Sequence, residues 1–129
     1  MKENGGIYDD LIITRMKDKY MIILNAACKQ NDLQIIKNKL NDQNLDINNN
    51  LSLIAIQGPE SKTILENVVS NVSKLKFMNG ENFSFKNNEI FITRSGYTGE
   101  DGFEISLPNK VAISFLSLIH ISEPTRRTQ

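Results

Sequence analysis

The sequence lacks tryptophan and contains one cysteine and one histidine among its 129 residues. A single cysteine excludes an intramolecular disulfide and every metal site built from several cysteines. A single histidine excludes a metal site with two histidine ligands. The sequence also lacks an excess of one charge, because 15 basic side chains balance 15 acidic ones. This balance gives no overall attraction to nucleic acid or to an acidic membrane surface.

Long hydrophobic runs are absent as well. No apolar stretch approaches the roughly 20 residues of a membrane-spanning helix, and the polar, acidic N-terminus does not resemble a signal peptide. The length fits one domain or part of a larger one. The apolar fraction of 40% is too high for simple disorder. We therefore expect a soluble, cytoplasmic chain that has no metal, nucleic-acid or membrane partner.

The first half of the chain predicts a hairpin, a helix and a further strand. β-Branched and apolar residues favour strands over residues 7–14 and 20–24, joined by a short polar turn as in an antiparallel hairpin. Apolar residues at helical spacing after Asn31 and Asp32 predict a helix over about 30–42. Residues 51–56 form a third apolar run. The continuous apolar character of the second and third strands predicts that both are buried.

The second half continues with a helix, three strands and a last helix. Pro59 suits the first turn of a helix. Strands are expected around 83–85 and 90–93, separated by an Asn-Asn turn, and over 103–107. A last helix follows Pro108. The order β-β-α-β-α-β-β-β-α predicts an α+β fold with a largely antiparallel sheet.

Two neighbouring acids follow a pair of glycines near the start of the sequence. Because side chains alternate along a strand, Asp9 and Asp10 should lie on opposite faces. A carboxylate in a cleft can accept hydrogen bonds from a ring N–H or stabilise developing positive charge. From the residues alone, a pair of acids that cap a turn is the favoured interpretation.

A glycine-rich loop, residues 96–102, precedes the last strand. Tyr97 supplies an aromatic ring and a hydroxyl, and Glu104 should lie opposite to Phe103 on the strand that follows. A carboxylate beside an aromatic ring suits a planar heterocycle that bears amino and N–H donors, such as a pterin or a purine. An ordinary hairpin with a polar face is the alternative. Asn25, at the end of the second strand, is equally well interpreted as a capping residue or a ligand contact.

Four stretches together resemble one family, the aminomethyltransferases, which are the T-proteins of the glycine cleavage system. The most specific part of these stretches is RSGYTGEDGFE (94–104), which lies within the fourth. The double Asp after the glycines also favours this family. The resemblance covers almost all of residues 1–115. The stretches stand in the family's order and spacing: GGIYDDLIITR (5–15), LNAACKQND (24–32), LIAIQGPES (53–61) and ITRSGYTGEDGFEISLPN (92–109).

The resemblance implies roles for four residues. Asp10 corresponds to the acid beside the reactive folate nitrogen, which makes it the expected catalytic residue. Asn25, Tyr97 and Glu104 correspond to residues of the pterin pocket, and the family's fold implies that all four border one cavity. Residues 1–115 would then be an internal part of the folate-binding domain, which we expect to be inactive alone.

The implied reaction transfers a one-carbon unit between two carriers. A lipoyl group on the H-protein carries an aminomethyl group, tetrahydrofolate accepts the one-carbon unit, and ammonia is released. The implied location is the cytoplasm in a bacterium and the mitochondrial matrix in a eukaryote. The alternative is a folate-binding module without transfer activity, or the folate domain of a protein similar to sarcosine or dimethylglycine dehydrogenase.

The end of the chain has a different character. Residues 116–126 match, in order, a translation of a transposon-type sequencing adapter. We therefore expect residues 116–129 to be a sequencing scar that does not belong to the natural protein. A natural helix end with a polar tail is the alternative. A helix that begins near Asn109 can still run into this tail, because Leu116 and Ile119 are apolar. Pro124 should end any such helix.

Overall fold

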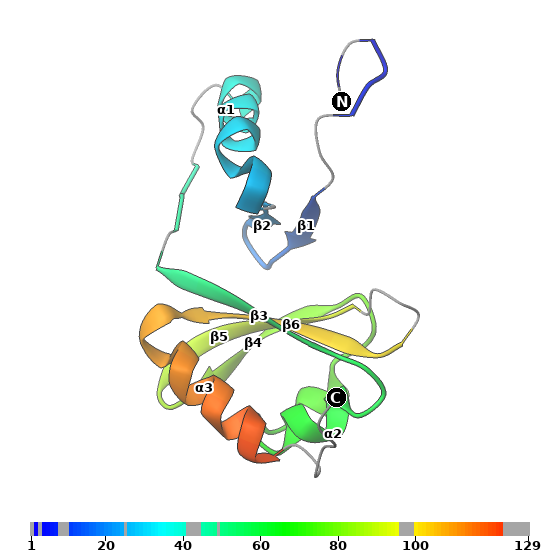
Figure 1. Cartoon of the computed structure of the whole chain (residues 1–129), viewed down its shortest axis with the longest axis vertical. Coiled ribbons are helices and arrows are strands. Elements are labelled where there is room, and N and C mark those ends of the chain that lie inside the picture. The colour runs from blue at the N-terminus through cyan, green and yellow to red at the C-terminus, as the bar shows by residue number, and fades with distance from the viewer. Residues whose placement is uncertain are drawn as a thin grey trace. The chain divides into compact units, whose positions relative to one another are not determined.

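The computed structural model describes residues 2, 4–7, 11–24, 26–40, 45–48, 50–95 and 100–122. The chain divides into two compact units, Met1–Ile47 and Asn48–Gln129, and each is described by itself. The predicted order of strands and α-helices and the α+β class are confirmed, with two short 3₁₀ helices added (Figure 1). The elements are β1 (Ile12–Arg15), β2 (Tyr20–Ile23), η1 (Ala26–Cys28), α1 (Lys29–Leu40), β3 (Leu51–Gln57), α2 (Ser61–Glu66), η2 (Val72–Lys74), β4 (Gly80–Phe85), β5 (Asn88–Arg94), β6 (Gly102–Pro108) and α3 (Asn109–Ser122).

The first unit contains the predicted hairpin. Strands β1 and β2 pair antiparallel, from Ile12 opposite Ile23 to Arg15 opposite Tyr20. The expected strand start at residue 7 is wrong, because Ile7 and Leu11 lie outside any strand. Strand β2 is only four residues long, so β1 has a pairing partner over the same length and no further.

The expected burial of β2 on both faces is also wrong. Tyr20 is 66% exposed and the other three residues are only half-buried. The physical reason is the size of the sheet, since two strands alone cannot cover both faces of either one. Helix α1 is confirmed within one residue at its start, and Asp32 lies in its first turn, where an acid favours the helix dipole.

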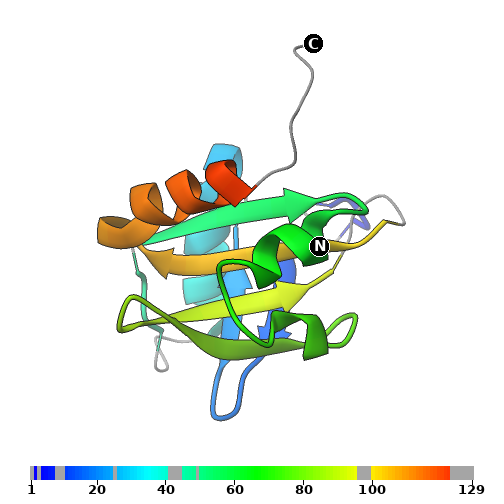
Figure 2. The ribbon, with the colours of Figure 1, turned by 90° about the horizontal axis from the view of Figure 1, so that it is seen from below.

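The second unit is a four-stranded antiparallel sheet with helices on one face. The strand order is β3-β6-β5-β4, which Figure 2 shows with α2 and α3 in front. The predicted inward face of β6 is confirmed, because Phe103, Ile105 and Leu107 are fully buried. The rest of the core comes from these two helices, their neighbouring turns and the facing strands: Ile56, Ile64, Leu65, Val69, Val72, Leu75, Phe85, Ile90, Ile92, Val111, Phe115 and Ile119.

Strand β3 is not the fully buried strand that its apolar run predicts. Leu51 and Leu53 are exposed, whereas Ile56 is buried. The alternation arises because β3 is an edge strand and the helices cover only one of its faces. The turn between β4 and β5 also differs from expectation. Its two residues, Lys86 and Asn87, have φ of 47° and 64°, as a tight two-residue hairpin requires, and Asn88 already belongs to β5.

Helix α3 extends past residue 115 without a break. The Phe115 ring packs edge-on against Phe85, with ring centroids 5.1 Å apart, and Ile119 one turn later is only 7% exposed. The helix thus runs into the segment that matches an adapter, and residues 123–129 lie outside the described part. The origin of residues 116–126 stays a prediction. Genomic DNA read beyond codon 115 should diverge from the adapter, and the same codons in an independent clone would contradict that expectation.

None of the helices in the described ranges is long and apolar enough to span a membrane.

Candidate functional site

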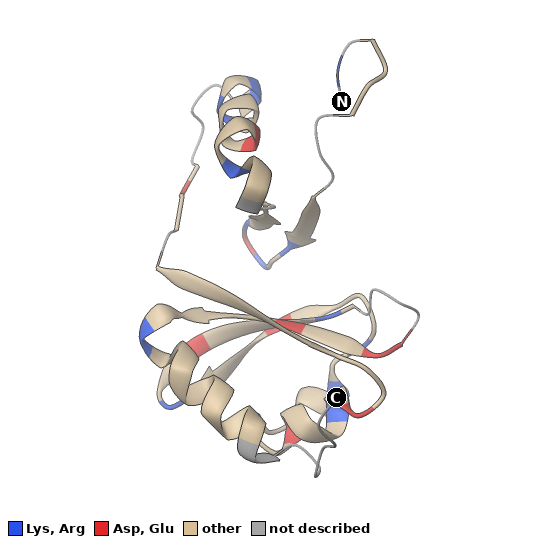
Figure 3. Ribbon diagram, in the orientation of Figure 1, with Lys and Arg blue, Asp and Glu red and all other residues tan. Residues whose placement is uncertain are grey.

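Charge does not single out a site in either unit. Figure 3 shows lysines, arginines, aspartates and glutamates interspersed over helices, strands and turns of the described residues. Within the same ranges, no group of three or more His, Cys, Asp or Glu side chains is placed to hold a metal ion. Individual buried polar side chains are therefore the features that can mark a site.

The structure places one of the four predicted site residues. Glu104 lies on β6, in the second unit. Asp10, Asn25 and Tyr97 lie outside the described residues, so their roles stay predictions.

Glu104 is a buried carboxyl group on an interior strand. Its exposed fraction is 6%, although β6 alternates and Phe103 and Ile105 on either side face the core. In the sheet register Glu104 stands between Ala55 of β3 and Thr93 of β5. Cross-strand partners share a face, so the carboxyl group lies on the face opposite to the α2 and α3 helices. The prediction that Glu104 points away from Phe103 and the core is confirmed.

One oxygen of this carboxyl group has no hydrogen-bond partner. The Oε1 atom of Glu104 is buried and unpaired among the described residues. An unsatisfied buried polar atom costs about 1–3 kcal/mol, and more when it is charged. Such an atom calls for an explanation, and a ligand that supplies the missing donor is one of them. A carboxylate accepts hydrogen bonds from N–H and amino groups, which a pterin ring presents side by side.

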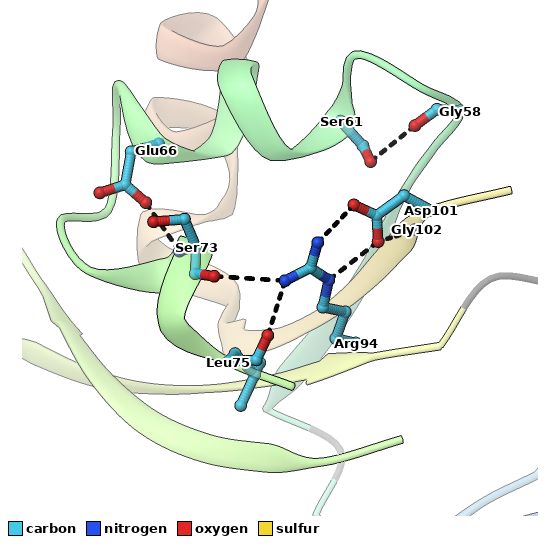
Figure 4. Close-up of polar contacts among 8 residues, drawn as sticks. All are labelled: Gly58, Ser61, Glu66, Ser73, Leu75, Arg94, Asp101 and Gly102. Atoms are coloured by element: carbon cyan, nitrogen blue, oxygen red, sulfur yellow. Dashed lines mark hydrogen bonds and ion pairs between the residues drawn. The ribbon is translucent and has the colours of Figure 1, made fainter. Parts of the chain in front are cut away.

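An arginine that the sequence analysis missed joins both ends of the loop before Glu104 (Figure 4). Arg94, the last residue of β5, donates from Nε to Asp101 Oδ1 over 2.9 Å and from Nη2 to Asp101 Oδ2 over 2.6 Å. Its Nη1 donates to the carbonyls of Leu75, at 2.6 Å, and Ser73, at 3.3 Å. Arg94 also lies over the Phe103 ring, 5.1 Å from its centroid. The side chains of Arg94 and Asp101 are 17% and 25% exposed.

Sequence position carries a signal for this pair. Arg94 ends one strand of a hairpin and Asp101 immediately precedes the next, so antiparallel pairing brings the two positions together. Ser95 N–H donates to Gly102 O across the same end of the hairpin, at 2.9 Å. An oppositely charged pair that flanks a hairpin loop could therefore have been predicted once β5 and β6 were paired.

The turn between β3 and α2 is hydrogen-bonded to Asp101 as well. Gly58, with φ of 115°, donates its N–H to the carbonyl of Asp101 at 2.8 Å. A side chain at this φ would be strained, which explains the glycine. Ser61 Oγ donates to the Gly58 carbonyl at 2.7 Å and fixes the start of α2 (Figure 4). The helix expected around Pro59 is present, but it begins at Ser61, two residues later. The turn before it is bonded to Asp101.

Two acids of this region have lowered pKa values. Hydrogen bonds from Arg94 hold the pKa of Asp101 below its usual value of 3.8, and the Gly102 N–H adds to them. The Ser73 N–H, at 2.7 Å, and the Asn71 N–H, at 2.9 Å, hold the pKa of Glu66 below 4.5. The bond to Asp101 also raises the pKa of Arg94. The two acids are therefore charged throughout the neutral range.

These shifts predict how stability depends on pH. A carboxyl group whose pKa is lower in the folded state stabilises the fold above its unfolded pKa, and this contribution disappears as the pH falls through the folded value. We expect the free energy of unfolding to fall as the pH drops below about 4.5, through 3.8 and lower. Urea titrations between pH 3 and 7, followed by circular dichroism, measure this free energy of unfolding. Asp101→Asn should flatten this dependence, and an unchanged slope in that variant would contradict the assignment.

Comparison with known proteins shows similarity to one family. A family model described as the GCVT N-terminal domain matches residues 1–122. The mitochondrial aminomethyltransferase of Dictyostelium discoideum is 37% identical over 127 residues, covering 90% of this chain and 32% of that protein. The aminomethyltransferase of Halothermothrix orenii is 41% identical over 114 residues, covering 84% and 32%.

A solved structure gives the same result. The crystal structure of glycine cleavage system aminomethyltransferase T from Bartonella henselae is similar with a TM-score of 0.78 and 36% identity, over 92% of this chain and 33% of that one. The chain thus spans about a third of the length of the relatives it matches.

Proposed function

Because this chain belongs to the GCVT N-terminal domain family, we propose that it is part of the folate-binding region of an aminomethyltransferase of the glycine cleavage system. Residues 1–115 form that part. The observation that carries the proposal is Glu104, a buried carboxyl group with one oxygen that has no partner among the described residues, at the position that the resemblance assigns to the pterin pocket. The similarity to aminomethyltransferases over most of the chain supports it.

The proposed substrates are tetrahydrofolate and an aminomethyl group bound to the lipoyl arm of the H-protein. A folate nitrogen attacks the aminomethyl carbon, ammonia leaves, and closure of the folate ring gives 5,10-methylenetetrahydrofolate. The lipoyl sulfur departs as the thiol of dihydrolipoyl H-protein. Lipoyl and folate groups supply the reactive atoms, so the protein contributes orientation and electrostatic stabilisation.

The residues divide these tasks. The free oxygen of Glu104 accepts hydrogen bonds from the pterin ring, and Asn25 and Tyr97 complete the contacts to the ring. Asp10 lies beside the reactive folate nitrogen and stabilises the positive charge that develops during transfer. A carboxylate suits this role because the iminium-like centre carries the opposite charge. The location follows the source, with the mitochondrial matrix for a eukaryote and the cytoplasm for a bacterium, since relatives of both kinds match.

The test uses the full-length enzyme that carries this segment. Incubation with aminomethylated H-protein and tetrahydrofolate should release ammonia and methylenetetrahydrofolate in equal amounts. The 129-residue chain should form neither at a substantial rate, because reacting groups that are not held in place lose their orientation. Binding of tetrahydrofolate without transfer by the full-length protein would favour a non-catalytic folate module. Absence of both binding and transfer would overturn the proposal.

A further inference from the structure

The strand pair that carries Glu104 is held by side-chain contacts on its opposite face, where Arg94 lies. Arg94 and Phe103 are cross-strand partners, and Thr93 and Glu104 are the next pair in the register. Phe103 faces the core and carries the Arg94 guanidinium over its ring. The carboxyl of Glu104 and the Arg94 guanidinium therefore lie on opposite faces of one pair of strands, one register step apart.

The hydrogen bonds of Arg94 converge from three separate segments. Asp101 lies at the end of the loop, whereas the carbonyls of Ser73 and Leu75 belong to η2 and to the residue that follows it (Figure 4). The third segment is the turn before β4. There Met78 N–H donates to Arg94 O at 2.6 Å and Arg94 N–H donates to Asn79 O at 2.9 Å. Two residues thus face one, which is a β-bulge.

Asp101 is fixed from its own side as well. Its Oδ1 accepts the Gly102 N–H at 3.1 Å, and its carbonyl accepts the Gly58 N–H. A Cβ on Gly102 would lie 2.1 Å from Gln57 Oε1, so a larger residue there would displace the end of the Gln57 side chain. The hydrogen bonds of Asp101 therefore hold the chain three residues before Glu104, immediately before β6 begins.

We propose that Arg94 and Asp101 are positioning residues for tetrahydrofolate binding: their ion pair fixes the start of β6, and thereby the direction of the Glu104 carboxylate. This rests on the proposed function. Neither residue touches the folate, so their loss displaces Glu104 without removing it. An arginine is required because its planar fork bonds Asp101 with two N–H groups and still reaches two carbonyls, which a lysine ammonium cannot do.

The experiment compares steady-state kinetics of full-length variants at a temperature well below their unfolding midpoints. Asp101→Asn keeps the acceptor for Gly102 and removes the charge, and Arg94→Met removes the fork. Each should raise the KM for tetrahydrofolate by about tenfold, as a small misplacement of a binding group does. The KM for aminomethylated H-protein should stay within about twofold in both. The double variant should be no worse than Arg94→Met, because the two residues act as one unit, and Arg94→Lys should not restore the KM.

Glu66 provides the matched control. Its carboxylate accepts the Asn71 and Ser73 N–H groups, so it holds the same η2 segment without bonding the loop or β6. Glu66→Gln should lower the unfolding midpoint and leave the KM for tetrahydrofolate unchanged. Arg94→Met and Asp101→Asn enzymes that behave like Glu66→Gln would overturn the positioning role. A wild-type enzyme that neither binds tetrahydrofolate nor turns over would instead overturn the proposed function, and the positioning role with it.

Discussion

Replacing Asp10 with asparagine in the full-length enzyme is expected to lower turnover by about 10²-fold or more, the usual effect of losing one electrostatic partner of a transition state. Asparagine keeps the size of the side chain and removes its charge. If Asp10 stabilises positive charge only as it develops, the loss falls on kcat. Binding of tetrahydrofolate should weaken much less, because the pterin contacts come from other residues.

The neighbouring acid is the natural control for this experiment. Asp9→Asn removes the same charge one residue away, at a position to which the family resemblance gives no role. Single-turnover measurements with aminomethylated H-protein should show a slow chemical step in Asp10→Asn and a normal one in Asp9→Asn. Equal turnover in Asp10→Asn and wild type would contradict the mechanism. Equal losses in both variants would indicate a general effect of charge near the hairpin.

Local patterns were sufficient for the order of the elements. Residues 103–107 alternate strictly, and the structure places Phe103, Ile105 and Leu107 in the core as that period predicts. The helix after Pro108 begins at Asn109, and α1 begins at Lys29, one residue from the predicted start. Strand faces and helix starts depend on the spacing of apolar residues and on capping residues close by in the sequence. They can therefore be predicted without knowing which distant segments pack against them.

Burial depended on partners that no local pattern reveals. The apolar runs of β2 and β3 are similar in composition to β5, yet only β5 is buried on both faces. Strand β5 lies between two strands, β3 lies at an edge, and β2 belongs to a sheet of two. The number of neighbouring strands is a property of the topology. A continuous apolar run therefore predicts a strand better than it predicts burial.

The polar contacts of the site were harder to predict than its candidate residues. A family motif and strand alternation indicated Glu104, and the structure adds that one of its oxygens is unpaired within the described part of the chain. The ion pair of Arg94 and Asp101 was not predicted, because neither the strand-end arginine nor the loop aspartate is unusual in the sequence alone. Its importance arises from the pairing of β5 with β6 and from carbonyls at residues 73 and 75. Such long-range geometry follows only from the folded chain.

Glu104 should show opposite effects on stability and on function. Glu104→Met removes a buried carboxyl group whose Oε1 has no partner among the described residues. The free energy of unfolding of the 129-residue chain should rise by about 1 kcal/mol, since the cost of that unsatisfied atom disappears. In the full-length enzyme the same substitution removes a charged hydrogen-bond acceptor. Affinity for tetrahydrofolate should then fall by about 10- to 100-fold, equivalent to the about 1.5–3 kcal/mol of such a bond.

Urea titration of the chain and calorimetric titration of the full-length enzyme with tetrahydrofolate measure the two effects. Glu89→Met, an exposed glutamate on the neighbouring strand β5, is the control and should change neither quantity appreciably. A carboxyl group that served only the fold would lower both stability and affinity when replaced, because the ligand site would loosen with the sheet. A gain in stability together with a loss of affinity arises only if the fold retains Glu104 for a ligand. A Glu104→Met enzyme that binds tetrahydrofolate as tightly as the wild type would remove Glu104 from the site.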